Sequence, residues 1–190
     1  MSYLLNREGP VVGITAADAA AGWRVLMTPD WRAAATDGAA LANVTFGNDF
    51  NRNCKVWSFA DANSKRIVLG DANSFLKMPA HTLSFVKFKF MWGQRAHATA
   101  TNDVRWIGRA IQSQTGSQIL NSTDADVRDV AGYVTSQEPA QYAYKIEELT
   151  ITLSSWEDRP TMLIFGRNGS AGTDNMSDAA LVYGIQVLVK

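Results

Sequence analysis

The strongest constraint on the fold is an alternation of side chains along Leu181–Lys190. Alternate positions hold Leu, Tyr, Ile, Val and Val, and the positions between them hold Val, Gly, Gln, Leu and Lys. A period of two places successive side chains on opposite faces of a sheet, so the segment predicts a β-strand. Since both faces carry apolar residues, we expect an inner strand that is covered on each side.

Similar segments recur from Val44 onward, and clusters of Gly, Asn, Asp, Ser and Thr separate them. These residue types favour turns for definite backbone reasons, so each cluster marks a break between strands. About ten short strands with this spacing are typical of a β-sandwich or barrel. We predict a jelly-roll-like antiparallel β-sandwich over residues 44–190. Its predicted strands are Val44–Phe46, Lys55–Phe59, Arg66–Leu69, Thr82–Trp92, Val104–Ser113, Gln118–Leu120, Gly132–Thr135, Ala143–Leu153, Thr161–Arg167 and Leu181–Val189.

Two of these strands carry a more detailed prediction. In Ser84–Trp92, Lys87 and Lys89 lie opposite an apolar face that should bury against the other sheet, each aromatic ring contributing roughly 2 kcal/mol. That face consists of Val86, Phe88, Phe90 and Trp92. In Tyr142–Leu153, the apolar positions change from even to odd numbers, which predicts a β-bulge near Glu147 and Glu148.

Residues 1–43 differ in composition from the rest of the chain. Alanine dominates between Ala16 and Ala42, but Gly22, Pro29 and Gly38 divide the segment into pieces too short for a stable independent helix. We expect an extended Ala-rich N-terminal arm. One alternative is that the arm covers the sheet of its own domain, and the other is that it reaches a neighbouring subunit. Trp23 and Trp31 are its candidate interface residues.

Charge and composition narrow the classes of partner. Lys and Arg number 18, as do Asp and Glu, so the formal net charge is zero, which argues against nucleic acid as a partner. A hydrophobic content of 46% fits a folded protein. The sequence has one cysteine, no apparent signal peptide and no apolar run long enough to span a bilayer, so we expect synthesis in the cytoplasm and no membrane partner.

The motifs of common enzymes are missing from the sequence. The two histidines, His81 and His97, have no nucleophile motif beside them, and Cys54 is most simply a half-buried residue entering a strand. A pair of remote carboxylates acting on a glycosidic bond stays open, without a motif to support it. We therefore expect no enzymatic activity and no cofactor.

Three surface features remain as binding candidates. Oxygen-rich loops could hold a structural calcium ion, although solvated loops are the simpler interpretation. Their residues are Asp124, Asp126 and Asp129 in one loop, and Asp174, Asn175 and Asp178 in the other. Arg105 and Arg109 share one strand face and could form a cationic stripe with Lys87 and Lys89. The loop Ser155–Pro160 presents Trp156 and Arg159 together, as a protein contact, a sugar-stacking site or a plug at the end of the sandwich.

The layout of an arm, eight to ten strands and a long loop before the closing strand resembles two groups of jelly-roll proteins. The first is bacteriophage virion proteins, especially capsid cement or decoration proteins and fibre domains. This resemblance implies a non-enzymatic virion protein, made in the host cytoplasm, that bridges capsid or other virion subunits as a homo-oligomer, with a trimer favoured. The layout carries over no functional residue of these groups, so the candidate interface residues remain those of the arm and the loop, Trp23, Trp31, Trp156 and Arg159. The second group is carbohydrate-binding modules, which implies a glycan as the partner.

Overall fold

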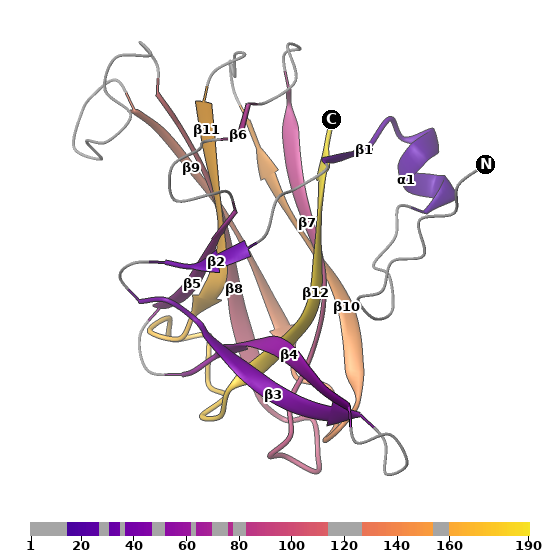
Figure 1. The fold of residues 1–190 in the computed structure, drawn as a ribbon, viewed down its shortest axis with the longest axis vertical. Coiled ribbons are helices and arrows are strands. Elements are labelled where there is room, and N and C mark those ends of the chain that lie inside the picture. The colour runs from indigo at the N-terminus through magenta and orange to yellow at the C-terminus, as the bar shows by residue number, and fades with distance from the viewer. Residues whose placement is uncertain are drawn as a thin grey trace.

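The computed structural model describes residues 15–26, 31–34, 37–46, 52–61, 64–69, 76–77, 83–113, 127–153 and 160–190. Two antiparallel sheets of six strands each face one another as the layers of a sandwich (Figure 1). The first sheet has the strand order β10-β7-β12-β4-β3, with β1 paired to β12. The second sheet has the order β2-β5-β11-β8-β9, with β6 paired to β11. The predicted all-β, jelly-roll-like sandwich is confirmed.

The first sheet is built from β1 (Arg24–Leu26), β3 (Ala40–Phe46), β4 (Arg52–Phe59), β7 (Phe85–Gly93), β10 (Tyr144–Thr152) and β12 (Ala180–Val189). The second is built from β2 (Trp31–Ala33), β5 (Ser64–Leu69), β6 (Leu76–Lys77), β8 (Asp103–Ser113), β9 (Val127–Gln137) and β11 (Pro160–Asn168). Nine of the predicted strands overlap these elements, and the tenth, Gln118–Leu120, lies outside the described residues. The one helix in the described part of the chain, α1 (Ala16–Ala20), is too short to cross a membrane.

Aromatic side chains from both sheets form the centre of the core. The predicted inner face of β7 is confirmed, because Phe88, Phe90 and Trp92 are fully buried. The ring of Phe90 lies 4.7 Å from that of Phe165 on β11 and 5.0 Å from that of Trp106 on β8, between ring centroids. These contacts join the two layers directly, so each large ring stabilises both sheets at once.

The layers approach each other most closely where β10 lies over β8 and β9. A methyl group at Gly108, on β8, would come within 2.7 Å of Leu149 and 2.8 Å of Phe88. Only a glycine leaves room for the layers at this separation. At the opposite side, Leu41 on β3 pairs with Trp57, whose ring packs against the core, yet Leu41 is 55% exposed. The layers are therefore packed tightly at β10, whereas Leu41 at the opposite edge of the first sheet is largely exposed.

The bulge predicted in β10 is wrong. Glu147 pairs with Phe90 and Glu148 with Lys89 in an uninterrupted register along the whole strand. The apolar phase changes because Tyr144 and Ile146 face solvent on the outer surface, with no extra residue between the two halves. The register shifts instead in β12, between Val182 and Gly184.

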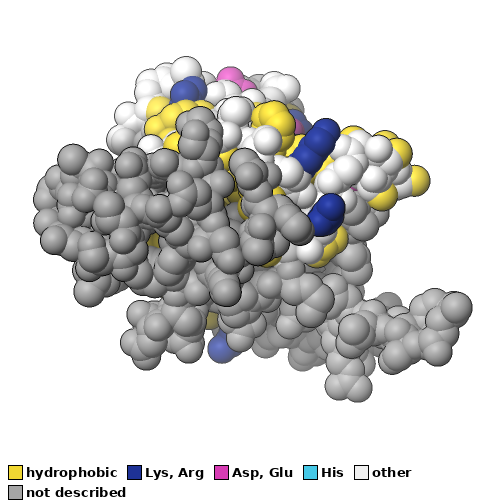
Figure 2. Space-filling model, turned by 90° about the horizontal axis from the view of Figure 1, so that it is seen from above, with side chains coloured by type: hydrophobic (Ala, Val, Ile, Leu, Met, Phe, Trp, Pro, Cys, Tyr) yellow, Lys and Arg dark blue, Asp and Glu magenta, His cyan; other side chains and the backbone are white. Residues whose placement is uncertain are grey.

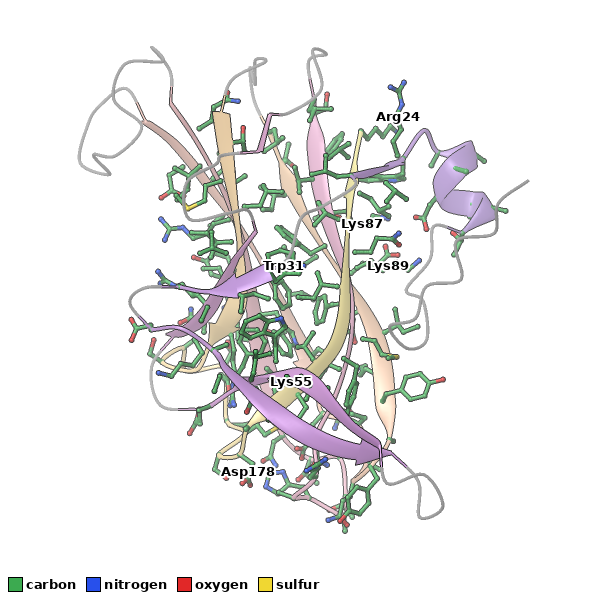
Figure 3. The ribbon with its side chains drawn as sticks, in the orientation of Figure 1. Arg24, Trp31, Lys55, Lys87, Lys89 and Asp178 are labelled. Atoms are coloured by element: carbon green, nitrogen blue, oxygen red, sulfur yellow. The ribbon has the colours of Figure 1, made fainter. Side chains whose placement is uncertain are left out.

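The N-terminal segment covers the first sheet of its own domain. Thr15 caps α1, accepting a hydrogen bond from the backbone N–H of Asp18 at 3.1 Å. The Asp18 carboxylate then accepts hydrogen bonds from Lys87 at 3.1 Å and Lys89 at 3.2 Å, both on the outer face of β7 (Figure 3). The predicted boundary at residue 43 falls inside β3, and β1 and β2 also belong to the sheets. The described part of the arm is thus integral to the sandwich.

Candidate functional site

A groove lies on the outer face of the second sheet, where four neighbouring strands contribute side chains. Its volume is about 280 Å³. We call it the sheet groove and define it by Arg66, Ile107, Arg109, Asp129, Tyr133 and Asn168. Its charged, aromatic and amide groups are the kinds of side chain that orient a polar ligand.

Strand register brings the residues of the sheet groove into one row. Ile107 on β8 pairs with Tyr133 on β9 and with Gly166 on β11, and Gly166 pairs with Arg66 on β5. Directly opposite residues in a sheet share a face, so all four lie on the outer surface. The floor of the groove is therefore set by backbone pairing in the middle of the sheet.

Gly166 allows Arg66 to lie along the sheet. A methyl group at this position would come within 2.2 Å of the Lys65 carbonyl oxygen and 3.1 Å of Cγ of Arg66. The Nε atom of Arg66 is buried and has no hydrogen-bond partner among the described residues. Leaving a donor buried and unsatisfied costs free energy, and the Arg66 side chain forms part of the lining of the groove.

The opposite side of the groove is fixed by an ion pair. Arg109 on β8 donates from Nε to Oδ1 of Asp129 at 3.1 Å and from Nη2 to the other carboxylate oxygen. This bidentate geometry is the strongest form of an arginine–carboxylate pair. It neutralises both groups and holds their planes in one orientation.

Tyr133 presents an aromatic ring to solvent beside the groove. Its side chain is 49% exposed, and the guanidinium carbon of Arg105 lies 4.8 Å from the ring centroid. The same guanidinium donates hydrogen bonds to Thr173 at 3.2 Å and Thr135 at 3.4 Å. The ring is thus braced from one side and accessible from the other.

The sequence located part of this site. The predicted shared face of Arg105 and Arg109 is confirmed, but their combination with Lys87 and Lys89 is wrong, because these lysines lie on the other sheet. On the face seen from above, the Lys and Arg side chains that are visible lie in separate patches (Figure 2). Asp129 was predicted in a loop and instead lies on β9, facing Arg109. Asp124 and Asp126 lie outside the described residues.

Tyr133, Arg66 and Asn168 were not singled out from the sequence. The alternation that predicts Gly132–Thr135 continues in both directions, and extending it would have placed Asp129 and Tyr133 on one face. No local pattern could have shown that β5 and β11 contribute to the same groove, because that follows from strand order.

Both predicted tryptophans of the arm contact their own domain. Trp23 lies 6.2 Å from Phe85 between ring centroids, with Nζ of Lys87 4.5 Å from the centroid of its ring. Trp31 lies 6.3 Å from Phe88 and packs against the core (Figure 3). Trp156 and Arg159 lie outside the described residues. Whether any of the four contacts another protein stays a prediction.

A paired-charge cluster lies on the covered outer face of the first sheet. Lys87 lies 2.8 Å from Glu148 and Lys89 lies 3.3 Å from it, so Asp18 and Glu148 together balance the two lysines. Hydrogen bonds from the hydroxyl and the backbone N–H of Thr15, followed by those from the two lysines, hold the pKa of Asp18 well below its ordinary range. Burial opposes the charged form of Lys87, but Glu148 and Asp18 outweigh it and raise the pKa of Lys87. This cluster is fully paired and therefore structural.

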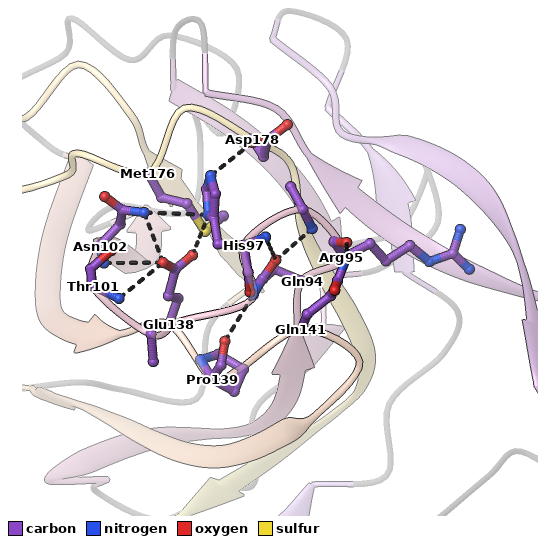
Figure 4. Close-up of polar contacts among 12 residues, drawn as sticks. Gln94, Arg95, His97, Thr101, Asn102, Glu138, Pro139, Gln141, Met176 and Asp178 are labelled. Carbon is purple, nitrogen blue, oxygen red and sulfur yellow. Dashed lines mark hydrogen bonds and ion pairs between the residues drawn. The ribbon is translucent and has the colours of Figure 1, made fainter.

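His97 belongs to a second polar cluster, at the end of the sandwich (Figure 4). Its Nδ1 lies 2.7 Å from Glu138, and its Nε2 lies 3.0 Å from Asp178. The hydrogen bond to Glu138, helped by the charges of Glu138 and Asp178, raises the pKa of His97. Burial would raise the pKa of Glu138, but His97 and donors from Asn102 and Thr101 outweigh burial and lower it. The cluster ties three loops together, and a nucleophile is not part of it among the described residues. His81 lies outside them.

The second predicted calcium loop is organised by an arginine. Asp174 is buried, and its carboxylate accepts hydrogen bonds from Arg167 at 2.6 and 2.9 Å and from the backbone N–H of Arg105 at 3.0 Å. Asn175 accepts from the backbone N–H of Asp103. These oxygens are therefore engaged by protein donors, and the interpretation of this loop as simply solvated is wrong for Asp174. Among the described residues, no group of three or more potential metal ligands gathers.

No protein-family model matches the chain, and no curated protein sequence matches it. Among solved structures, a non-crystalline-cellulose-specific carbohydrate-binding module, CBM28, is similar with a TM-score of 0.46 and 16% identity, over 82% of this chain and 84% of that one. A CBM22-1 xylan-binding domain from Paenibacillus barcinonensis has a TM-score of 0.44 and 10% identity, over 84% and 85%. The enzymatically active domain of tailspike protein 4 from bacteriophage CBA120 has a TM-score of 0.39 and 7% identity, over 88% of this chain and 19% of that one.

Proposed function

We propose that this protein is a non-enzymatic carbohydrate-binding β-sandwich and that the sheet groove is its sugar-binding site. The observation that carries the proposal is the exposed ring of Tyr133 in one groove with the guanidinium groups of Arg66 and Arg109. A sugar ring has C–H faces that pack on an aromatic ring and hydroxyls at its rim that need donors and acceptors. The groove offers both kinds of contact within one row of the sheet.

The charges of the sheet groove favour binding over bond cleavage. Hydrolysis of a glycosidic bond commonly requires two carboxyl groups about 5–10 Å apart. Asp129 is the one carboxylate among the described residues that line the groove, and Arg109 engages both of its oxygens. A carboxylate whose two oxygens both accept hydrogen bonds from one guanidinium is poorly placed to act on a glycosidic oxygen.

The alternative role as a capsid cement protein has weaker support. Its predicted clamp residues in the arm, Trp23 and Trp31, pack against Phe85 and Phe88 of the same chain. Those contacts agree with an arm that covers its own domain. A role in a virion, including at a fibre that binds glycans, stays a prediction.

The proposal is tested by glycan-array screening of the full chain, followed by calorimetry on the strongest ligand. Tyr133→Ala is expected to weaken binding at least tenfold, about 1.4 kcal/mol. Tyr144→Ala is the matched control, because Tyr144 is also exposed but lies on the first sheet. No binding anywhere on the array, or equal losses in the two variants, would overturn the proposal.

A further inference from the structure

We propose that the sheet groove selects an anionic glycan, one that carries carboxylate or sulfate groups. This inference rests on the proposed function and specifies the ligand class of the same site. It starts from the balance of charge on the outer face of the second sheet. Three guanidinium groups, those of Arg66, Arg105 and Arg109, lie in or beside the groove.

Only one of these guanidinium groups has a carboxylate partner among the described residues. Asp129 neutralises Arg109 through two hydrogen bonds. Arg105 donates to the neutral hydroxyls of Thr135 and Thr173, and Arg66 forms no described ion pair. Asp103 lies near the end of the same face, but its contacts are made through its backbone. Among the described residues, Arg66 and Arg105 thus have no carboxylate bonded to them.

These two arginines are held where they can contact one ligand. Arg66 lies in the same row as Ile107 and Tyr133, and Arg105 is two residues from Ile107 along β8. Strands are spaced by about 4.8 Å and residues along a strand by about 3.3 Å, so the two backbone positions are roughly 12 Å apart. Arg66 and Tyr133 both line the groove, and the guanidinium of Arg105 contacts the ring of Tyr133. A ligand that fills the groove and packs on Tyr133 can therefore meet both guanidinium groups.

The chemistry of these groups favours an anion over a neutral sugar. Guanidinium donors bind the paired oxygens of carboxylate and sulfate in a bidentate manner, and these hydrogen bonds are about twice as strong as neutral ones. Arg66 lines the groove and forms no ion pair with a described residue, so its guanidinium can bind an anionic group of the ligand. Asp129 is already neutralised and would not repel the ligand strongly.

The test compares matched ligands by calorimetry on the full chain. Polygalacturonate is measured against its carboxyl-reduced form, and a sulfated glycosaminoglycan is measured against its desulfated form. We expect at least one anionic ligand to bind tenfold or more tightly than its neutral counterpart, with affinity that falls as salt rises. Which pair shows the preference distinguishes carboxylate from sulfate as the recognised group.

Three variants test which arginines produce the preference for the anionic ligand. Arg66→Gln and Arg105→Gln are each expected to reduce the preference for the anionic form at least threefold. Arg24→Gln, a change at an exposed arginine on β1 of the other sheet, is the control and should leave the preference unchanged. Circular dichroism checks that each variant is folded.

The possible outcomes separate this inference from the proposed function. Equal binding of neutral and anionic forms, with loss in Tyr133→Ala, would overturn the anionic preference and keep the sugar site. No binding of any glycan would overturn both. Equal losses in Arg24→Gln and Arg66→Gln would indicate unspecific charge attraction and overturn the inference. Tighter binding of a single-stranded oligonucleotide than of any glycan would also overturn it.

Discussion

The outer faces of the two sheets carry similar side chains but are covered differently. On the first sheet, Lys87 and Lys89 lie beneath α1, are less than 10% exposed, and are balanced by Asp18 and Glu148. On the second sheet, Arg105 and Tyr133 remain accessible beside a groove. Basic residues that alternate with buried ones thus stabilise the fold on one face and can serve recognition on the other. The difference depends on whether another segment supplies counter-charges.

Removing a charge from the covered outer face of the first sheet should have the largest effect on stability. Asp18→Asn removes the charge that α1 places between Lys87 and Lys89, so the two buried lysines would share only Glu148. We expect the greatest loss of unfolding free energy among the variants discussed, because an incompletely paired buried charge is strongly destabilising.

Asp129→Asn is the matched control on the open face. Its partner Arg109 is partly exposed, so we expect a loss below about 1 kcal/mol. Urea denaturation of both variants measures the two losses. Equal losses would show that the two faces do not differ in the way we describe.

A substitution in the floor of the sheet groove should have an intermediate effect on the free energy of unfolding. Gly166→Ala would place a methyl group against the Lys65 carbonyl and beneath Arg66, which we expect to cost about 1–3 kcal/mol and to weaken glycan binding. Gly172→Ala is the control, because nothing lies within 4 Å of the added methyl group. A Gly166→Ala protein with unchanged stability and binding would contradict the close approach.

Titration of His97 should have the smallest effect on the free energy of unfolding. It should leave the outer faces of both sheets unchanged. Because the pKa of His97 is raised in the folded state, its contribution is complete below about pH 6.5 and is lost as pH rises through the folded pKa. The pKa of Glu138 is lowered, so its contribution is complete above about pH 4.5 and is lost as pH falls through the folded value. Both contributions are complete between these two pH values.

His97→Gln should therefore flatten the decline in stability above pH 6.5. Denaturation at a series of pH values measures this, with His81→Gln as the control for the other histidine. If His97→Gln keeps the wild-type decline in stability above pH 6.5 and His81→Gln loses it, the titrating group is His81 and the prediction is wrong.

Local alternation was enough to predict most strands and the inner face of β7. Alternation alone gave a wrong prediction in β10, because the exposed side chains of Tyr144 and Ile146 produce the same change of apolar phase that a bulge would produce. The short strands β1 and β2 were missed because three residues cannot establish a period.

The roles of the charged residues depended on contacts that no local pattern contains. Asp18 and Lys87 are 69 residues apart in the sequence, so the pairing that makes the lysines structural is visible only in the folded chain. In the same way, Arg66 joins Tyr133 only because β5, β11, β8 and β9 lie in that order. The sequence indicated basic strand faces, and the topology determined which face was left open.

The close seating of Leu149 and Phe88 against Gly108 has a further consequence for motion within the sandwich. Ile107 and Arg109, which line the sheet groove, adjoin Gly108 on β8, at the side where the layers are clamped together. The loosely covered margin at Leu41 lies on the other side. Local opening follows the regions with the fewest buried contacts. Local opening of the sandwich should therefore begin at β3, while the sheet groove keeps its shape.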